Sequence, residues 1–120
     1  MPTAEAASLL GPAARVLAAA HARGLAHGSL RASRLIVGPE NEVRVTGFGL
    51  LLDARPEQDV AALGTLLLEC VTGRPHGPFV RGNLPPDLER LARAARGEDP
   101  HRTTDAALFA FELESWVGTR

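Results

Sequence analysis

The sequence predicts a mainly α-helical domain that carries one small β-hairpin, and two observations lead to this fold class. The stretch from Asp59 to Gly73 is apolar on almost every side of a helical wheel, and a helix of that kind lies inside a domain. From Leu25 to Leu50 the apolar residues instead form pieces of two or three separated by polar and turn residues, a pattern typical of short strands. A chain of 120 residues is long enough for one core, so we expect a single domain over residues 1–120.

The helix from Asp59 to Gly73 is expected to be the centre of the fold. The Asp59 carboxylate is suited to cap the first turn, and Gly73 supplies the left-handed residue that commonly ends a helix. Cys70 is the one cysteine of the sequence, so it cannot form an internal disulfide. Its position among apolar residues predicts a small buried side chain rather than a reactive thiol.

A first helix is predicted from Thr3 to Arg23, with Thr3 as its cap and Gly24 as its stop. The pair Gly11-Pro12 interrupts it, because proline removes one backbone hydrogen bond. We therefore expect the helix either to kink just before this pair or to start afresh at the proline. Apolar residues three and four positions apart form its predicted buried stripe: Leu9, Leu10, Ala13, Val16, Leu17 and Ala20.

The hairpin is predicted from two short apolar pieces, Leu35–Val37 and Val43–Val45. The residues between them, Gly38-Pro39-Glu40-Asn41, are typical of a turn. A hairpin of this size is not stable alone, so we expect it to lie on the helices.

Loops and helices are predicted to alternate over the rest of the chain. Residues 53–58 form a polar connection, residues 74–83 a loop rich in glycine and proline, and residues 97–102 another loop. A helix from about 84 to 96 lies between the last two loops, and its inward residues are Leu88, Leu91 and Ala95.

A last helix is predicted to begin with Thr103 or Thr104 as its cap. Its apolar residues follow the spacing of a helix that packs on a core. The candidates for burial are Ala107, Leu108, Phe111, Leu113 and Trp116.

Composition and charge argue against several kinds of partner. The net charge of −1 gives no reason to expect nucleic acid or acidic lipid. The N-terminus is acidic where a signal peptide would be basic, and no apolar run reaches the length of a membrane span. His21, His76 and His101 share no metal-ligand spacing. We expect a cytoplasmic protein without direct membrane insertion, metal or cofactor.

Six segments, in this order, resemble the C-terminal lobe of a bacterial serine/threonine protein kinase, without the N-terminal lobe. The resemblance runs nearly from end to end. The segments are a helix ending His21-Ala-Arg-Gly24, the stretch His27-Gly-Ser-Leu-Arg-Ala-Ser-Arg34, the hairpin, Thr46-Gly-Phe-Gly49, the aspartate-led helix ending Thr72-Gly-Arg-Pro75, and Asp99-Pro-His-Arg-Thr103.

The departures from this family fall on the residues that the reaction needs. Phosphoryl transfer uses an aspartate as base, and an asparagine and a second aspartate that hold magnesium. By the resemblance these positions carry Ser29, Arg34 and Gly47. A serine hydroxyl is not a useful base near neutral pH, arginine repels a dication, and glycine has no side chain. The resemblance therefore implies that the chain is not an enzyme and keeps no catalytic, cofactor or metal residue.

The residues that match the family's structural motif are retained. The resemblance implies that His27 and Phe48 stack in the core and that Asp59 bonds back to the backbone near His27. It also implies that Arg102 pairs with Glu57; the rival acidic partner for this arginine is the aspartate at position 53.

The sequence thus predicts a pseudokinase, an inactive module that acts as a scaffold or regulator. The connection over residues 49–59 is too short for an activation segment and a peptide-binding platform. The expected partner is another protein, or a second copy, bound through the face that an N-terminal lobe would cover. Two alternatives stay open. One is a degenerate small-molecule phosphotransferase, whose motif begins with the letters HGD where this sequence has His27-Gly28-Ser29. The other is a fragment of a longer kinase-like protein.

Overall fold

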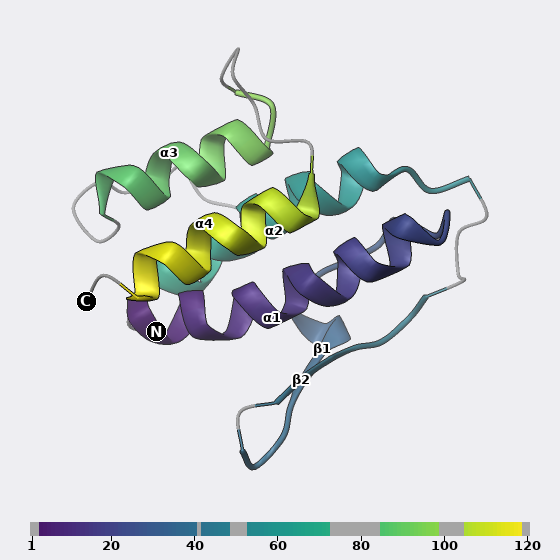
Figure 1. The fold of residues 1–120 in the computed structure, drawn as a ribbon, viewed down its shortest axis with the longest axis horizontal. Helices are drawn as coiled ribbons and strands as arrows, with labels where there is room; N and C mark the ends of the chain where they lie inside the picture. Colours follow the sequence, from purple (N-terminus) through teal and green to yellow (C-terminus); the bar gives the residue numbers. More distant parts are fainter. Residues whose placement is uncertain (1–2, 41, 49–52, 73–84, 99–104, 119–120) are drawn as a thin grey trace.

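Four helices and a two-stranded antiparallel hairpin make up the part of the chain that the computed structural model describes, residues 3–40, 42–48, 53–72, 85–98 and 105–118. The mainly α-helical fold class with one hairpin is therefore confirmed. Figure 1 shows α1 and α4 side by side, with α2 behind them, α3 beyond α4, and the hairpin beside α1. The elements are α1 (Thr3–Ala22), the short 3-10 turn η1 (Ala32–Arg34), β1 (Leu35–Val37), β2 (Val43–Val45), α2 (Pro56–Thr72), α3 (Pro86–Ala95) and α4 (Ala106–Gly118).

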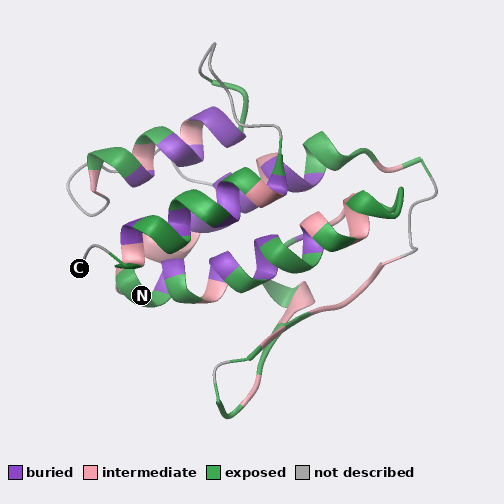
Figure 2. Cartoon of the chain, viewed as in Figure 1, coloured by how far each residue is buried: buried purple, intermediate pink, exposed green. Residues whose placement is uncertain are grey.

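Helix α2 lies inside the helical layer, as predicted. Every residue from 59 to 71 is buried or half-buried (Figure 2). Leu63 and Leu67 are completely buried and belong to the same apolar cluster as residues of α1, α3 and α4. The apolar character all round the helix reflects contacts with each of the other three helices.

The start of α2 differs from the prediction. The helix begins at Pro56, where proline is well tolerated because the first turn has no partner for its missing N–H. The side-chain oxygen of Gln58 accepts a hydrogen bond from the Arg55 N–H. Asp59 therefore lies inside the first turn of α2, and the prediction that it caps the helix is wrong. The polar connection, predicted to extend to residue 58, ends before Pro56. The predicted stop, Gly73, lies outside the described residues.

Helices α2 and α3 approach each other closely at Gly64. A Cβ built on this glycine would lie 2.6 Å from the carbonyl oxygen of Ala92 and 3.0 Å from the Cβ of Ala95. Any larger side chain at this position would push the two helices apart. Helix α3 buries the three residues predicted to face inward, Leu88, Leu91 and Ala95.

Helix α1 runs unbroken through Gly11 and Pro12, so of the two predicted outcomes the restart at the proline is wrong, and the kink stays a prediction. Its buried side packs on α4 and α2 both before and after the proline, and this packing outweighs the loss of one backbone hydrogen bond. The helix ends at Ala22, one residue before the predicted Arg23, and the predicted stop residue Gly24 follows with φ of +79°. Val16, predicted to be buried, is 37% exposed.

The hairpin has the predicted strands, paired in the register Leu35 with Val45, Ile36 with Arg44 and Val37 with Val43. Strand β2 contacts α1, and Leu35 and Val45 pack on the core. The hairpin thus rests on the helices, as expected.

Helix α4 buries a different set of residues from the one predicted. Leu113 and Trp116 are buried, but Leu108 and Phe111 are 45% and 56% exposed. Phe109, which was not predicted, is completely buried instead. The register of the helix decides this: the side formed by 106, 109, 110, 113 and 116 faces the core. The backbone N–H of residue 107 is capped by the side chain of residue 105, and the two threonines predicted as caps lie outside the described residues.

None of the helices in the described ranges is long and apolar enough to cross a bilayer.

Candidate functional site

The carboxylate of Asp59 anchors the loop that follows α1. Asp59 is completely buried. Its Oδ2 accepts a hydrogen bond from the backbone nitrogen of His27 at 2.8 Å, and its Oδ1 accepts one from the backbone nitrogen of Gly28 at 2.8 Å. Gly28 has φ of +82°, which glycine adopts readily. The contact with the backbone near His27, implied by the resemblance, is therefore present.

A third donor to Asp59 comes from the end of α1. The Nε2 atom of His21 lies 2.8 Å from Oδ2 of Asp59, and the His21 side chain is only 13% exposed. The carboxylate oxygen can only accept, so the imidazole N–H donates. In the sequence His21 was weighed only as a metal ligand, and this role was missed. A further donor to Asp59 could have been predicted, because a buried carboxylate needs several hydrogen-bond donors.

The ring of His27 is fixed on both nitrogen atoms. Its Nε2 donates to the carbonyl oxygen of Thr46 at 2.6 Å, because a carbonyl can only accept. Its Nδ1 accepts from the backbone nitrogen of Ser29 at 3.1 Å. The ring of Phe48 meets it edge to face, with centroids 4.9 Å apart and planes at 67°. His27 is completely buried, so the expected contact with Phe48 forms part of the core.

Arg34 and Gly47, which by the resemblance stand where the kinase family has metal ligands, lie against each other. Gly47 has φ of +90°. A Cβ built on it would lie 3.1 Å from Cδ and 3.2 Å from Nη1 of Arg34. The pair is held together by Thr46, whose backbone nitrogen and Oγ1 donate to the Arg34 carbonyl oxygen at 2.7 and 3.0 Å. The Arg34 side chain thus fills the space beside the α-carbon of Gly47.

The residues around Gly47 do not fit the magnesium ion that the kinase fold would imply. Magnesium is bound through carboxylate and other oxygen ligands, whereas Arg34 brings a positive charge and its Nε is buried without a hydrogen-bond partner. Ser29, at the position of the base, lies with its Oγ 3.5 Å from His27 Nδ1. In the described ranges no three His, Cys, Asp or Glu residues are grouped so that they could hold a metal.

The predicted ion pair of Glu57 and Arg102 stays a prediction, because Arg102 lies outside the described residues. Glu57 is exposed on the first turn of α2, and the rival Asp53 is exposed just before that helix. The structure therefore brings together His27, Phe48 and Asp59, but does not test this pair.

The mainly helical fold, with a hairpin and an anchored loop beside its interior helix, is consistent with the C-terminal lobe of a protein kinase. Comparison with known proteins supports a kinase-related region. The chain is 24% identical over 166 residues to the serine/threonine-protein kinase PknL of Mycobacterium tuberculosis, in strains CDC 1551 and H37Rv, and equally similar to PknL of Mycobacterium bovis. No family model matches the sequence.

The match covers 96% of the chain but only 41% of each PknL protein. The chain therefore spans about two-fifths of the length of these relatives. The alignment has 166 positions and the chain has 120 residues, so at least 46 aligned positions of the relative have no counterpart here.

Proposed function

We propose that this chain is a catalytically inactive kinase-like module of the cytoplasm that acts by binding another protein. The observation that carries the proposal is the packing of Arg34 against Gly47, with Cδ 3.1 Å from the position of a Cβ. A guanidinium group beside this glycine repels a dication, whereas magnesium is bound through carboxylate and other oxygen ligands. Metal-dependent phosphoryl transfer would then lack both its metal site and its base.

The chain length supports the same proposal. Seven residues, 49–55, connect Phe48 to the start of α2. Kinases need a longer segment here to position a peptide substrate. A loss of substrate docking together with the metal site leaves binding as the remaining role.

Exposed apolar residues of the hairpin support a protein partner. Ile36 and Val37 on β1 are 52% and 47% exposed, and Leu25, in the loop before η1, is 57% exposed. In the kinase fold this side would face an N-terminal lobe. Apolar side chains left in water here are expected to be covered by a partner protein or by a second copy.

The catalytic part of the proposal is tested by thermal unfolding with ATP, with and without magnesium. A ligand present at a hundred times its dissociation constant stabilises a protein by about 2.7 kcal/mol, which raises the melting temperature by several degrees. We expect no change in either condition. A rise that requires magnesium would contradict the proposal.

The binding part is tested on the hairpin. Light scattering over a range of concentrations, with a dye that reports exposed apolar surface, should show self-association or dye binding. Ile36→Ser should reduce both. A monomer at high concentration that binds no dye would count against a partner on this face.

A further inference from the structure

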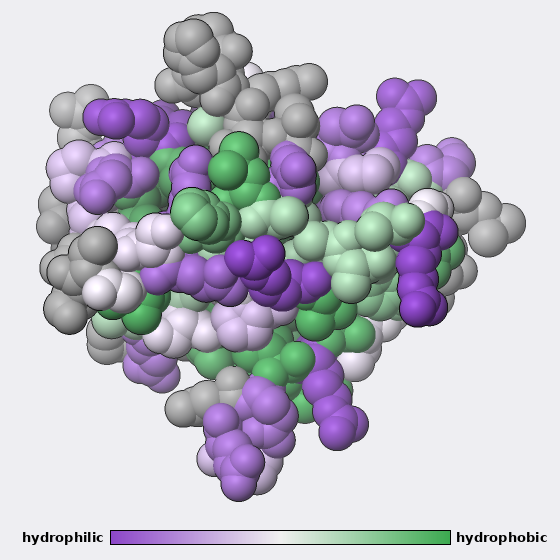
Figure 3. Space-filling model, viewed as in Figure 1, coloured by the Kyte–Doolittle hydropathy of each residue, from purple (hydrophilic) through white to green (hydrophobic). Residues whose placement is uncertain are grey.

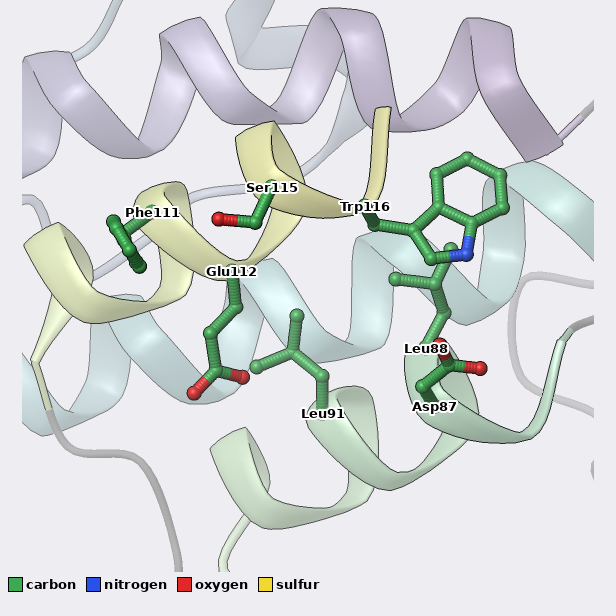
Figure 4. A pocket seen from close by; sticks show the side chains of 7 residues that line it. All are labelled: Asp87, Leu88, Leu91, Phe111, Glu112, Ser115 and Trp116. Atoms are coloured by element: carbon green, nitrogen blue, oxygen red, sulfur yellow. The ribbon is translucent and has the colours of Figure 1, made fainter. Parts of the chain in front are cut away.

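A hollow of about 330 Å³ lies between α3 and α4, on the opposite side of α4 from α1 (Figure 4). Leu88 and Leu91 of α3 and Trp116 of α4 are almost completely buried beneath it. Phe111, Glu112 and Ser115 line it from α4. The hollow is therefore an apolar groove between two helices, separate from the loop that Asp59 anchors.

Helix α4 exposes apolar side chains along the side that borders this groove. Phe111 is 56% exposed, and Leu108, three residues earlier and on the same helical face, is 45% exposed. The side of α4 that faces the core is formed by other residues, among them Phe109 and Leu113, which are completely buried. Figure 3 shows apolar surface where α3 and α4 lie side by side, bordered by hydrophilic side chains. A helix that is apolar on both sides has a second surface suited to a partner.

Two carboxylates give this surface its charge. Asp87 of α3 and Glu112 of α4 both line the groove, and in Figure 4 they lie at separate points along it. Neither forms an ion pair among the residues that the structure describes. The arginines of α3, Arg90 and Arg93, are not among the residues that line the groove, and Arg93 is paired with Glu89. The groove is therefore apolar with a negative border.

We propose that the groove between α3 and α4 binds a basic amphipathic helix of a partner protein. Such a helix inserts apolar side chains, spaced three and four residues apart, between Phe111 and Trp116. Arginine or lysine residues beside these side chains pair with Asp87 and Glu112. An acidic helix would meet repulsion at the same two carboxylates.

This inference rests on the binding role proposed above, but it assigns that role to a second surface. The hairpin face and the groove are built from different elements. ATP binding would contradict the inactive state without touching the groove, whereas failure of the groove test leaves the evidence from Arg34 and Gly47 unchanged.

The test uses the full chain and two synthetic helical peptides. Both carry leucines at positions i, i+3, i+4 and i+7; one has arginines and lysines beside them, and the other has glutamates at those positions. Trp116 is the only tryptophan and lines the groove, so its fluorescence reports binding directly. We expect the basic peptide to shift the tryptophan emission, with affinity that falls as salt rises, and the acidic peptide to leave it unchanged.

Surface variants locate the binding site. Phe111→Ala should weaken binding of the basic peptide by about tenfold or more. Glu112→Arg should weaken it as well and raise the affinity for the acidic peptide. Val16→Ala removes an exposed apolar side chain from α1, away from both the groove and the hairpin, and it serves as the matched control that should bind as the unmodified chain does. Circular dichroism checks that each variant is folded.

Three results would overturn the assignment. One is equal binding of the two peptides, or binding of neither. Another is loss of binding in Val16→Ala but not in Phe111→Ala, which would move the site away from the groove. The third is a tryptophan shift that depends on protein concentration alone and disappears in Phe111→Ala, which would make a second copy the occupant.

Discussion

The Oδ2 atom of Asp59 lies 2.8 Å from the backbone nitrogen of His27, 32 residues earlier in the chain. This hydrogen bond connects the interior helix α2 to the loop that, in a kinase, would carry the catalytic base. The anchored loop is therefore present, although by the resemblance Ser29 stands at the position of the base. Such a loop can be held in place without the side chains of the reaction, since different side chains supply the two.

Asp59→Asn should destabilise the protein by about 3 kcal/mol. The carboxylate accepts hydrogen bonds from two backbone N–H groups and from His21. An amide has one acceptor oxygen and would turn its NH₂ group toward at least one of these donors, inside the protein. Chemical denaturation measures the change. Glu112→Gln changes an exposed carboxylate of α4; it is the control and should alter stability by less than about 0.5 kcal/mol. Equal losses in the two variants would refute the anchoring role.

Gly47→Ala should cost about 1–3 kcal/mol, for two separable reasons. The φ of +90° is unfavourable for any residue with a Cβ, and the new methyl group would press on Arg34. In a double-mutant cycle with Arg34→Ala, the loss of stability caused by contact between the new methyl group and Arg34 should disappear. The loss caused by the backbone conformation of residue 47 should remain. If Gly47→Ala melts at the same temperature as the unmodified chain, the close packing of Arg34 on Gly47 is wrong.

Leu67→Asp should prevent folding. Leu67 is completely buried in α2, and an aspartate there would be a charge without a partner. The measurement is the far-ultraviolet circular dichroism of the purified variant. Leu25→Asp, at a position that is 57% exposed, should fold as the unmodified chain does. A folded Leu67→Asp with an unchanged melting temperature would contradict the interior position of α2.

Cys70 should react slowly with alkylating reagents near neutral pH. Burial raises the pKa of its thiol, with a smaller contribution from the neighbouring carboxylate of Glu69. The thiol pKa is higher in the folded protein than in the unfolded chain. The contribution of this thiol to folding stability is therefore fully present below the unfolded pKa of about 8.5, and it is lost as the pH rises toward the pKa of the folded protein. Between pH 7 and 10, the alkylation rate should begin to rise at a higher pH in the native protein than in the protein unfolded in denaturant. Identical profiles would disprove the shielding.

Local sequence patterns were sufficient to predict the hairpin and the interior helix. The turn residues between Leu35–Val37 and Val43–Val45 predicted a hairpin with the observed strands, and the apolar run after Asp59 predicted the interior helix. These features depend on neighbours in the sequence, so they can be recognised without the fold. The position of Gly24 at the end of α1 was recognised in the same way.

Features that depend on contacts between distant segments were not predictable in this way. Helix α1 continues through Pro12 because α4 and α2 hold it, and Phe109 rather than Phe111 is buried because of how α4 meets α1. The third donor to Asp59, His21, comes from 38 residues away.

The sequence by itself determined that the hairpin and the interior helix form and which residue types stand in the kinase-like segments, since each is a property of residue type and local spacing. Only the tertiary structure decided which polar atoms meet in the interior and which apolar side chains stay in water. That difference arises because hydrogen bonds and burial depend on distances between segments, and the linear order of residues does not specify those distances.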